Sequence, residues 1–150
     1  MAATFAFLHH LAAFTLVAAL AVQFVLLRDA VTVASARKLQ AIDTVYGMAA
    51  VVLLIIGLGR VFHFEKGATY YFHTWTFIAK LSLFIIIGLV SIIPTIAFLS
   101  WRKAVKQGQV PSVDAQRMRS LRSIIHLELA GVVLILLMAA LMAKGVGLML

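Results

Sequence analysis

The sequence predicts an all-α integral membrane protein, an antiparallel bundle of four transmembrane helices. The first observation is composition: 64% of the residues are hydrophobic and 12% are charged, whereas a soluble domain is about half apolar. The second is length, because about 20 apolar residues are enough to cross a bilayer. Four such runs cover approximately residues 5–27, 41–62, 72–99 and 121–143. A chain of 150 residues is too short for a second domain, so residues 1–150 form a single transmembrane domain.

The first two runs are joined by a polar connection, residues 28–40. The run 5–27 ends at Arg28 and Asp29, and neither Lys nor Arg precedes it. A signal peptide starts with a basic segment, so we expect this run to be retained as a helix. The second run carries Asp43 near its start and Arg60 near its end.

The third run, residues 72–99, follows a short connection over residues 63–71 and leads into a basic one over residues 100–120. Gly67 predicts a turn in the first connection, and Pro94 predicts a kink near the end of the run. Gly108 and Pro111 separate the basic connection from the helices on either side. The fourth run, residues 121–143, ends at Lys144.

The basic residues are unequally divided between the two sides of this bundle. Of the 13 Lys and Arg residues, nine flank the first and third connections, three lie on the opposite side and one, Lys80, lies within a span. Loops rich in Lys and Arg stay in the cytoplasm. We therefore expect both termini outside, an N-out/C-out orientation. The charge of +8 is explained by this rule, and we expect no nucleic-acid partner.

Lys80 is the residue in the third run that most needs an explanation. It lies about eight residues inside the apolar run, or about 12 Å deep at about 1.5 Å per residue. A charge there costs at least about 2.5 kcal/mol unless it has a partner or faces water. Most polar residues of this run share one helical face with Lys80, so this face is expected to point into the bundle. The face comprises His73, Thr76, Lys80, Phe84, Ile87, Ser91 and Pro94.

With this orientation, the outer half is rich in imidazole and basic groups, and the inner half holds the two intramembrane carboxylates. The outer half contains His9, His10, Arg60, His63, His73 and Lys80, and the inner half contains Gln23, Asp43, Tyr46, His126 and Glu128. His9 shares a face with small residues and Gln23, which is typical of a packed helix interface. We therefore expect His9, rather than His10, to face inward.

Each of these residues also has a purely structural interpretation. Asp43 and Glu128 lie near the cytoplasmic surface, where they could pair with Arg28, Arg119 or Arg122. Alternatively, Asp43, Tyr46 and Glu128 serve proton transfer. His9 and Lys80 lie deeper and are functional candidates, because buried ionisable groups in membranes usually have a role.

The chemistry available to His9 and Lys80 is limited by the rest of the sequence. There is no cysteine, which excludes disulfides and thiolate metal sites. A neutral imidazole is a good axial ligand for haem iron, so His9 is a candidate metal ligand for haem b. Lys80 and Arg60 are candidates for holding the anionic groups of a tetrapyrrole. The inner half offers a single histidine, His126, so we do not expect two haems.

The chain resembles an uncharacterised bacterial family of four-span membrane proteins over nearly its whole length. The resemblance implies the fold and a place in the bacterial inner membrane, but no activity. It rests on Leu8-His9, Leu27-Arg28, Asp43 with Tyr46-Gly47, Gly57 to Arg60, Lys66-Gly67 with Tyr70-Tyr71, Lys80, Pro94-Thr95 with Trp101-Arg102, and Glu128-Leu129.

More distantly, the chain is similar to the HemJ-type protoporphyrinogen oxidases, which are small four-helix membrane proteins that bind haem. His9 matches the histidine of their first span, and Trp75 with Lys80 matches a tryptophan–lysine pattern in the third. Arg122 with Glu128 matches a basic-then-acidic start to the last span. The chain lacks the tryptophan of the first span and the Asn-Glu-Pro that opens the fourth.

The leading hypothesis is a haem- or tetrapyrrole-binding membrane protein, with oxidoreductase activity as one use of the cofactor. The second is a small transporter or channel-like subunit, in which the Lys80 face lines a polar pathway and the carboxylates relay protons. The third is a structural membrane subunit whose charges set the helix register. All three place the chain in a lipid bilayer, and all three are compatible with a homodimer.

The orientation can be tested with reporter fusions after Leu150 and within residues 65–69. Nine basic residues against three predict that both fusions report the outside of the cell. A fusion at Gln109, in the basic connection, serves as the control and should report the cytoplasm. A cytoplasmic signal from either of the first two fusions would overturn the orientation.

Overall fold

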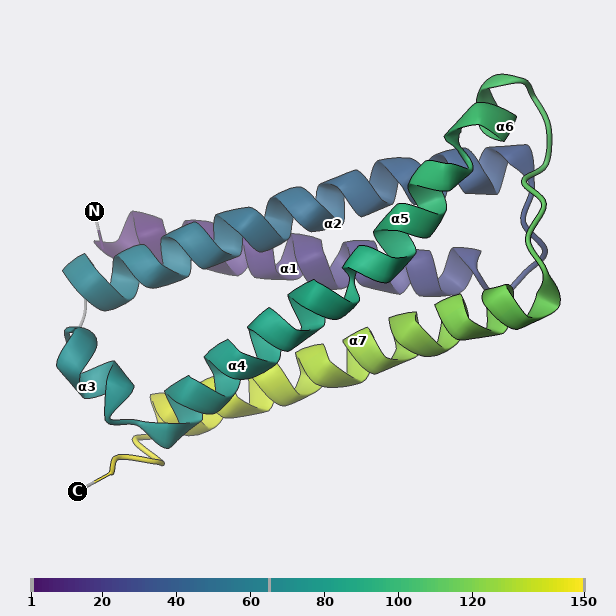
Figure 1. The fold of residues 1–150 in the computed structure, drawn as a ribbon. Coiled ribbons are helices and arrows are strands. Elements are labelled where there is room, and N and C mark those ends of the chain that lie inside the picture. The colour runs from purple at the N-terminus through teal and green to yellow at the C-terminus, as the bar shows by residue number, and fades with distance from the viewer. Residues whose placement is uncertain (1, 65, 150) are drawn as a thin grey trace.

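The computed structural model describes residues 2–64 and 66–149, and it is helical along nearly all of them. Glu65, in the connection predicted over residues 63–71, and Leu150 lie outside the described residues. The helices follow one another in the order shown in Figure 1. They are α1 (Ala2–Leu26), α2 (Val33–Gly59), the π-helical turn η1 (Arg60–Phe64), α3 (Ala68–Phe72), α4 (Trp75–Val90), α5 (Ile92–Ser100), α6 (Arg102–Lys106) and α7 (Ala115–Ala143).

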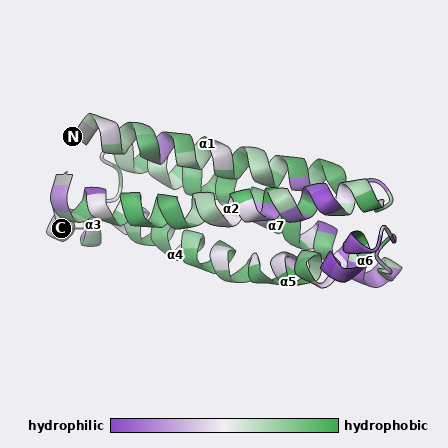
Figure 2. Cartoon of the chain, turned by 90° about the horizontal axis from the view of Figure 1, so that it is seen from above, coloured by the Kyte–Doolittle hydropathy of each residue, from purple (hydrophilic) through white to green (hydrophobic). Residues whose placement is uncertain are grey.

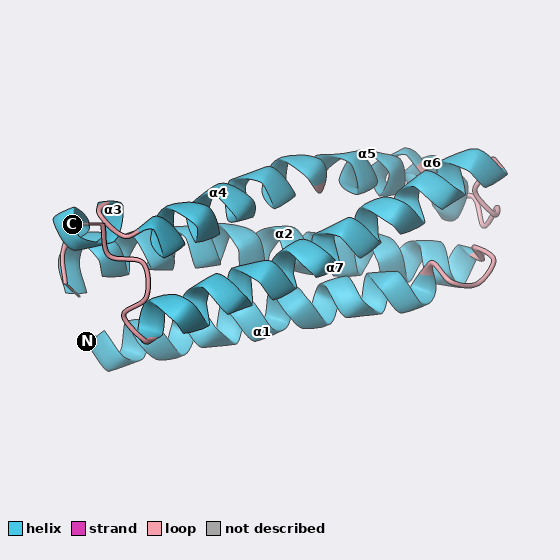
Figure 3. Ribbon diagram, turned by 90° about the horizontal axis from the view of Figure 1, so that it is seen from below, coloured by secondary structure: helices cyan, strands magenta, loops and turns pink. Residues whose placement is uncertain are grey.

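The helices form an antiparallel bundle made of two pairs. α1 packs along α2, and α4 packs along α7, while α1 and α7 join the pairs. Both chain termini lie at one end of the bundle beside α3 (Figure 1), and we call this the terminal end. The opposite end carries the α1–α2 connection and α6, which Figure 3 shows from below, and we call it the basic end.

The outer surface of the bundle is suited to lipid. Phe14, Leu89 and Val133 are each more than 60% exposed, although their side chains are apolar. Hydrophobic residues cover the length of the helices, and hydrophilic residues gather around α6 (Figure 2). Four helical segments of 24 to 32 residues are long and apolar enough to cross a membrane. The prediction of an all-α, four-span bundle is therefore confirmed.

Two helices begin inside the predicted polar connections, several residues before their apolar runs. α2 begins at Val33, within the predicted connection 28–40, because Thr32 and Ser35 form a reciprocal capping box. α7 begins at Ala115, within the predicted connection 100–120, where the Asp114 side chain accepts a hydrogen bond from the Arg117 backbone at 2.7 Å. Hydropathy marks where a helix leaves hydrocarbon, whereas capping decides where the helix starts.

The kink predicted from Pro94 is confirmed as the break between α4 and α5 at Ser91. Proline has no N–H to donate to the carbonyl of Val90, four residues earlier. At the break, the Ser91 hydroxyl donates to the Gly88 carbonyl at 2.7 Å. The segment therefore continues across the bundle as two helices in slightly different directions (Figure 1).

The C-terminal tail is fastened to the start of α4. The Trp75 backbone donates to the Gly147 carbonyl at 2.9 Å, and the Met149 backbone donates to the His73 carbonyl at 2.8 Å. Gly147 has a φ of +105°, and a Cβ there would lie 2.8 Å from the Thr76 side chain. Glycine is therefore required both for the conformation and for the close approach.

α4 and α7 pack closely where Ile87 lies over Gly131. A Cβ built on Gly131 would lie 2.3 Å from Cδ1 and 2.9 Å from Cγ1 of Ile87. Small residues at a transmembrane helix interface allow the backbones to come together. Gly131 thus sets the spacing of the second helix pair.

Gly131→Ala should destabilise the bundle by about 1–3 kcal/mol, the usual range for overpacking a core. Ile87→Val removes the nearest methyl group, so the double variant should lose less stability than the sum of the two single variants. Unfolding in mixed micelles titrated with SDS measures both effects. Gly88→Ala is the control, because a Cβ there meets nothing within 4 Å. Equal losses for Gly131→Ala and Gly88→Ala would contradict the assignment.

Candidate functional site

A mostly apolar pocket of about 200 Å³ lies between the two helix pairs, in the half of the bundle nearest the terminal end. All four long helical segments contribute to its wall, together with η1 and α3. Three lining residues are basic or imidazole groups: His9, Arg60 and Lys80. The others are Ala, Gly, Val, Leu, Ile, Met, Phe and one Tyr. The three candidate cofactor-binding residues therefore line the same cavity.

His9 reaches the pocket from α1 because α2 carries a glycine opposite it. A Cβ on Gly57 would lie 3.4 Å from Cε1 of His9, so the imidazole ring packs directly over the glycine. His10 is exposed, and its Nδ1 lies 2.6 Å from the Ala6 carbonyl oxygen. The prediction that His9 rather than His10 faces inward is confirmed.

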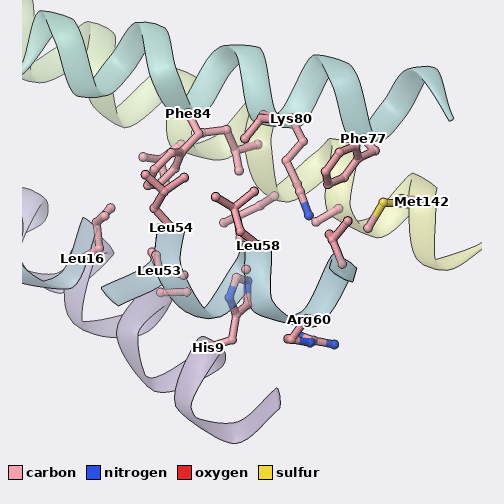
Figure 4. Close-up of a pocket in the computed structure, with 18 of the residues that line it drawn as sticks. His9, Leu16, Leu53, Leu54, Leu58, Arg60, Phe77, Lys80, Phe84 and Met142 are labelled. Atoms are coloured by element: carbon pink, nitrogen blue, oxygen red, sulfur yellow. The ribbon is translucent and has the colours of Figure 1, made fainter. Parts of the chain in front are cut away.

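Lys80 points into the pocket from α4, on the side opposite His9 (Figure 4). Its Nζ lies 5.7 Å from the centroid of the Phe77 ring, in range of a cation–π interaction. Arg60, the first residue of η1, lies on the same side of the pocket as His9 (Figure 4). Lys80 and Arg60 are both partly buried.

The prediction that the Lys80 face points into the bundle is correct along α4 and α5. Thr76, Ile87 and Pro94 are buried, and the residues between them on this face are partly buried. His73 is the exception: it precedes α4, is exposed, and its Nδ1 lies 2.7 Å from the Thr69 carbonyl oxygen. The phase of a helix predicts the direction of a side chain only within that helix.

A second group of polar residues is buried in the half of the bundle nearest the basic end. The Gln23 side-chain amide donates to Oδ1 of Asp43 at 3.1 Å, joining α1 to α2. The Thr95 side chain, from α5, also lies in hydrogen-bonding reach of Asp43. Gln23 is 1% exposed and Asp43 is 9% exposed. These contacts meet the need of a buried carboxylate for donors.

Glu128 joins this group from α7 through a hydroxyl of α2. Its carboxyl group lies in hydrogen-bonding reach of the Tyr46 hydroxyl, which also interacts with Ser91. Glu128 is 1% exposed, and Oε1 has no hydrogen-bond partner among the described residues. We call Gln23, Asp43, Tyr46, Ser91, Thr95 and Glu128 the carboxylate cluster.

The alternative in which arginines neutralise the two carboxylates is wrong for the part of the chain that the structure describes. Arg122 donates instead to the backbone carbonyls of Leu27 and Arg28, at 2.5 and 3.3 Å. It therefore caps the C-terminal end of α1, whose last carbonyls lack partners within the helix. Asp43 and Glu128 contact hydroxyl and amide groups.

Thr95 is the member of the cluster whose role could not be predicted. Its signal is its spacing, because it lies four residues after Ser91 and next to Pro94 on the buried side of the helix. The sequence places Gln23 in the right half of the membrane, but does not pair it with Asp43. Such pairings depend on how α1, α2 and α5 are packed.

An apolar layer separates the pocket from the carboxylate cluster. On α1, α2 and α4, one buried residue lies between those that line the pocket and those that join the cluster, and on α7 Val132 lines the pocket itself. The layer consists of Leu20, Ala49 and Ile87, all less than 10% exposed. The two polar sites are therefore chemically distinct: one is open, apolar and basic, and the other is closed, oxygen-rich and acidic.

The comparisons with known proteins identify a family without an assigned activity. A family model described as "Predicted membrane protein (DUF2214)" matches residues 1–147. No curated protein and no solved structure matches the chain.

Gln23→Leu should destabilise the bundle by about 1–3 kcal/mol, because it leaves a buried carboxylate with one donor fewer. Asp43→Asn combined with Gln23→Leu should cost less than the sum of the two single changes, since the contact can be lost only once. Thr15→Val is the control on the same helix, because the Thr15 hydroxyl donates only to the Leu11 carbonyl of its own helix. Strict additivity, measured by SDS-induced unfolding, would show that the Gln23–Asp43 contact does not contribute.

Proposed function

We propose that this chain, which belongs to the family "Predicted membrane protein (DUF2214)", binds haem b or another anionic tetrapyrrole in the pocket between its helix pairs. The observation that carries the proposal is the convergence of His9, Lys80 and Arg60 on one apolar cavity. Ligand pockets are typically apolar with a few polar groups that orient the ligand. The likeness of His9, Trp75 and Lys80 to the HemJ-type pattern supports the same ligand class.

His9 would be the axial ligand of the iron. Among the described residues that line the pocket, it is the single imidazole, and the other four histidines of the chain are exposed. A neutral imidazole coordinates haem iron through one ring nitrogen. A haem held by His9 would supply one-electron chemistry.

Lys80 and Arg60 would hold the carboxylate groups of the ligand. Both are cationic and partly buried at the edge of an apolar cavity, where charges interact more strongly than in water. Arginine also offers a fork of donors that matches a carboxylate. The apolar side chains of the wall would contact the macrocycle.

The size of the pocket limits how much of the ligand it can enclose. About 200 Å³ is less than the ~300–1,000 Å³ typical of pockets for drug-sized ligands. A tetrapyrrole would therefore be only partly enclosed, with the rest of its apolar surface in contact with lipid between the diverging helix pairs. A narrower anionic amphiphile would satisfy the same three side chains.

The predicted orientation also indicates in which half of the membrane the pocket lies. If the basic end lies in the cytoplasm, as the positive-inside rule predicts, the pocket lies in the outer half of the bacterial inner membrane. A ligand would then enter from the outer leaflet.

His9→Ala should abolish the Soret band of detergent-purified protein supplied with haem, because it removes the axial ligand. Lys80→Met should retain the band and weaken haem binding about tenfold, as expected for the loss of one charge contact worth about 1.4 kcal/mol. Haem titration followed by visible absorption measures both. His10→Ala is the matched control, because the neighbouring imidazole is exposed outside the pocket.

Circular dichroism shows whether each variant keeps its helices. A wild-type preparation that stays colourless after haem is supplied would favour a transporter or a structural subunit. Equal loss of the band in His9→Ala and His10→Ala would contradict the assignment of His9.

A further inference from the structure

The carboxylate cluster has a chemistry of its own that the pocket does not use. Its members come from all four spans, and the apolar layer separates them from His9 and Lys80. Gln23 and Glu128 are each 1% exposed, and Asp43 is 9% exposed. The protein therefore keeps two carboxyl groups in its buried interior, apart from the residues that line the pocket.

Two ionised carboxylates at this place would be very costly. Charges buried in a medium of low dielectric are tolerated when they are paired with an opposite charge. Within residues 2–64 and 66–149, neither Asp43 nor Glu128 has a basic partner, and Arg122 is engaged by the end of α1. One of the two carboxyl groups therefore needs a cation, and the smallest is a proton.

The hydrogen bonds distinguish the two carboxyl groups. Asp43 has two donors, the Gln23 amide and the Thr95 hydroxyl. Glu128 has the Tyr46 hydroxyl, and its Oε1 has no partner among the described residues. Hydrogen-bond donors favour the ionised form of a carboxyl group. A buried oxygen without a donor is tolerated far better on a neutral acid than on a carboxylate.

We propose that the carboxylate cluster is a proton-binding site in which Glu128 carries one proton and Asp43 is ionised. Tyr46 lies between Glu128 and the Ser91 hydroxyl, so it can accept a hydrogen bond from the protonated acid and remain in contact with α4 and α5. The ligand of this site is the proton itself. The site is independent of whether the pocket binds a tetrapyrrole.

Among the residues that the structure describes, the surroundings of Glu128 are otherwise uncharged. The titratable groups that face it are Asp43 and Tyr46 of α2, while α1 and α5 contribute the neutral side chains of Gln23 and Thr95. His126, on α7, is exposed and packs its ring edge to face with Phe24. Proton loss from Glu128 would therefore place a second negative charge beside Asp43.

Infrared spectroscopy of the full-length protein in micelles tests the proposal. At neutral pH, wild type should show the carbonyl stretch of a protonated carboxyl group, and Glu128→Gln should lack it. Asp43→Asn should keep the band, because Asp43 is the ionised member. Asp29→Asn is the control, since Asp29 lies in an exposed connection. Loss of the band in Asp43→Asn but not in Glu128→Gln, or its absence from wild type, would overturn the assignment.

A second measurement requires no variant and therefore does not depend on how Glu128→Gln folds. Dicyclohexylcarbodiimide adds to protonated carboxyl groups in apolar surroundings and leaves a stable acylurea that peptide mapping can locate. We expect at least tenfold more adduct on Glu128 than on Asp29 or Asp114, which are both exposed. Equal labelling of all three carboxyl groups would contradict the proposal. Protection by added Na⁺ at constant pH would overturn it in favour of a metal-cation site.

Discussion

The need to give every buried polar group a partner, in a solvent that offers none, is the constraint on which this structure depends. Asp43 is the clearest example of a buried polar group whose partners come from other helices. Its bonds to Gln23 and Thr95 join α1, α2 and α5 at one level, and Glu128 adds α7 through Tyr46. Lipid competes for apolar contacts as well as a neighbouring helix does, so in membranes hydrogen bonds and close packing hold helices together. The carboxylate cluster therefore sets which faces of the four spans meet.

The difference between the two halves of the bundle follows from where these contacts lie. In the half nearest the basic end, the carboxylate cluster and the packing of Ile87 over Gly131 bring the helix pairs together. In the other half, η1 and α3 connect the pairs across a wider gap, and the C-terminal tail fastens the start of α4. The pocket is located there because large side chains from both pairs line it without filling it.

The two polar sites are complementary in charge. The pocket places cationic and imidazole groups against an apolar wall, which suits an anionic amphiphile. The carboxylate cluster, the proton site that we propose, is buried, and Leu20 and Ile87 lie between it and the pocket. The separation of the two sites is compatible with either use of the pocket, in a redox protein or in a proton-coupled transporter.

Composition and periodicity alone determined the four spans, the inward face of Lys80 and the choice of His9 over His10. These properties depend on the amount of apolar surface and on the phase of a single helix, and both can be read from local sequence. The starts of α2 and α7 were missed because capping by Thr32 and Asp114, not hydropathy, places them. Tertiary structure decided the partners of Asp43 and Glu128. Arg122 donates to a backbone carbonyl at the end of α1, and hydroxyl groups of other helices contact the two carboxyl groups instead. Pairing between helices depends on how the helices are rotated and shifted relative to one another. The local sequence of one helix does not contain this information.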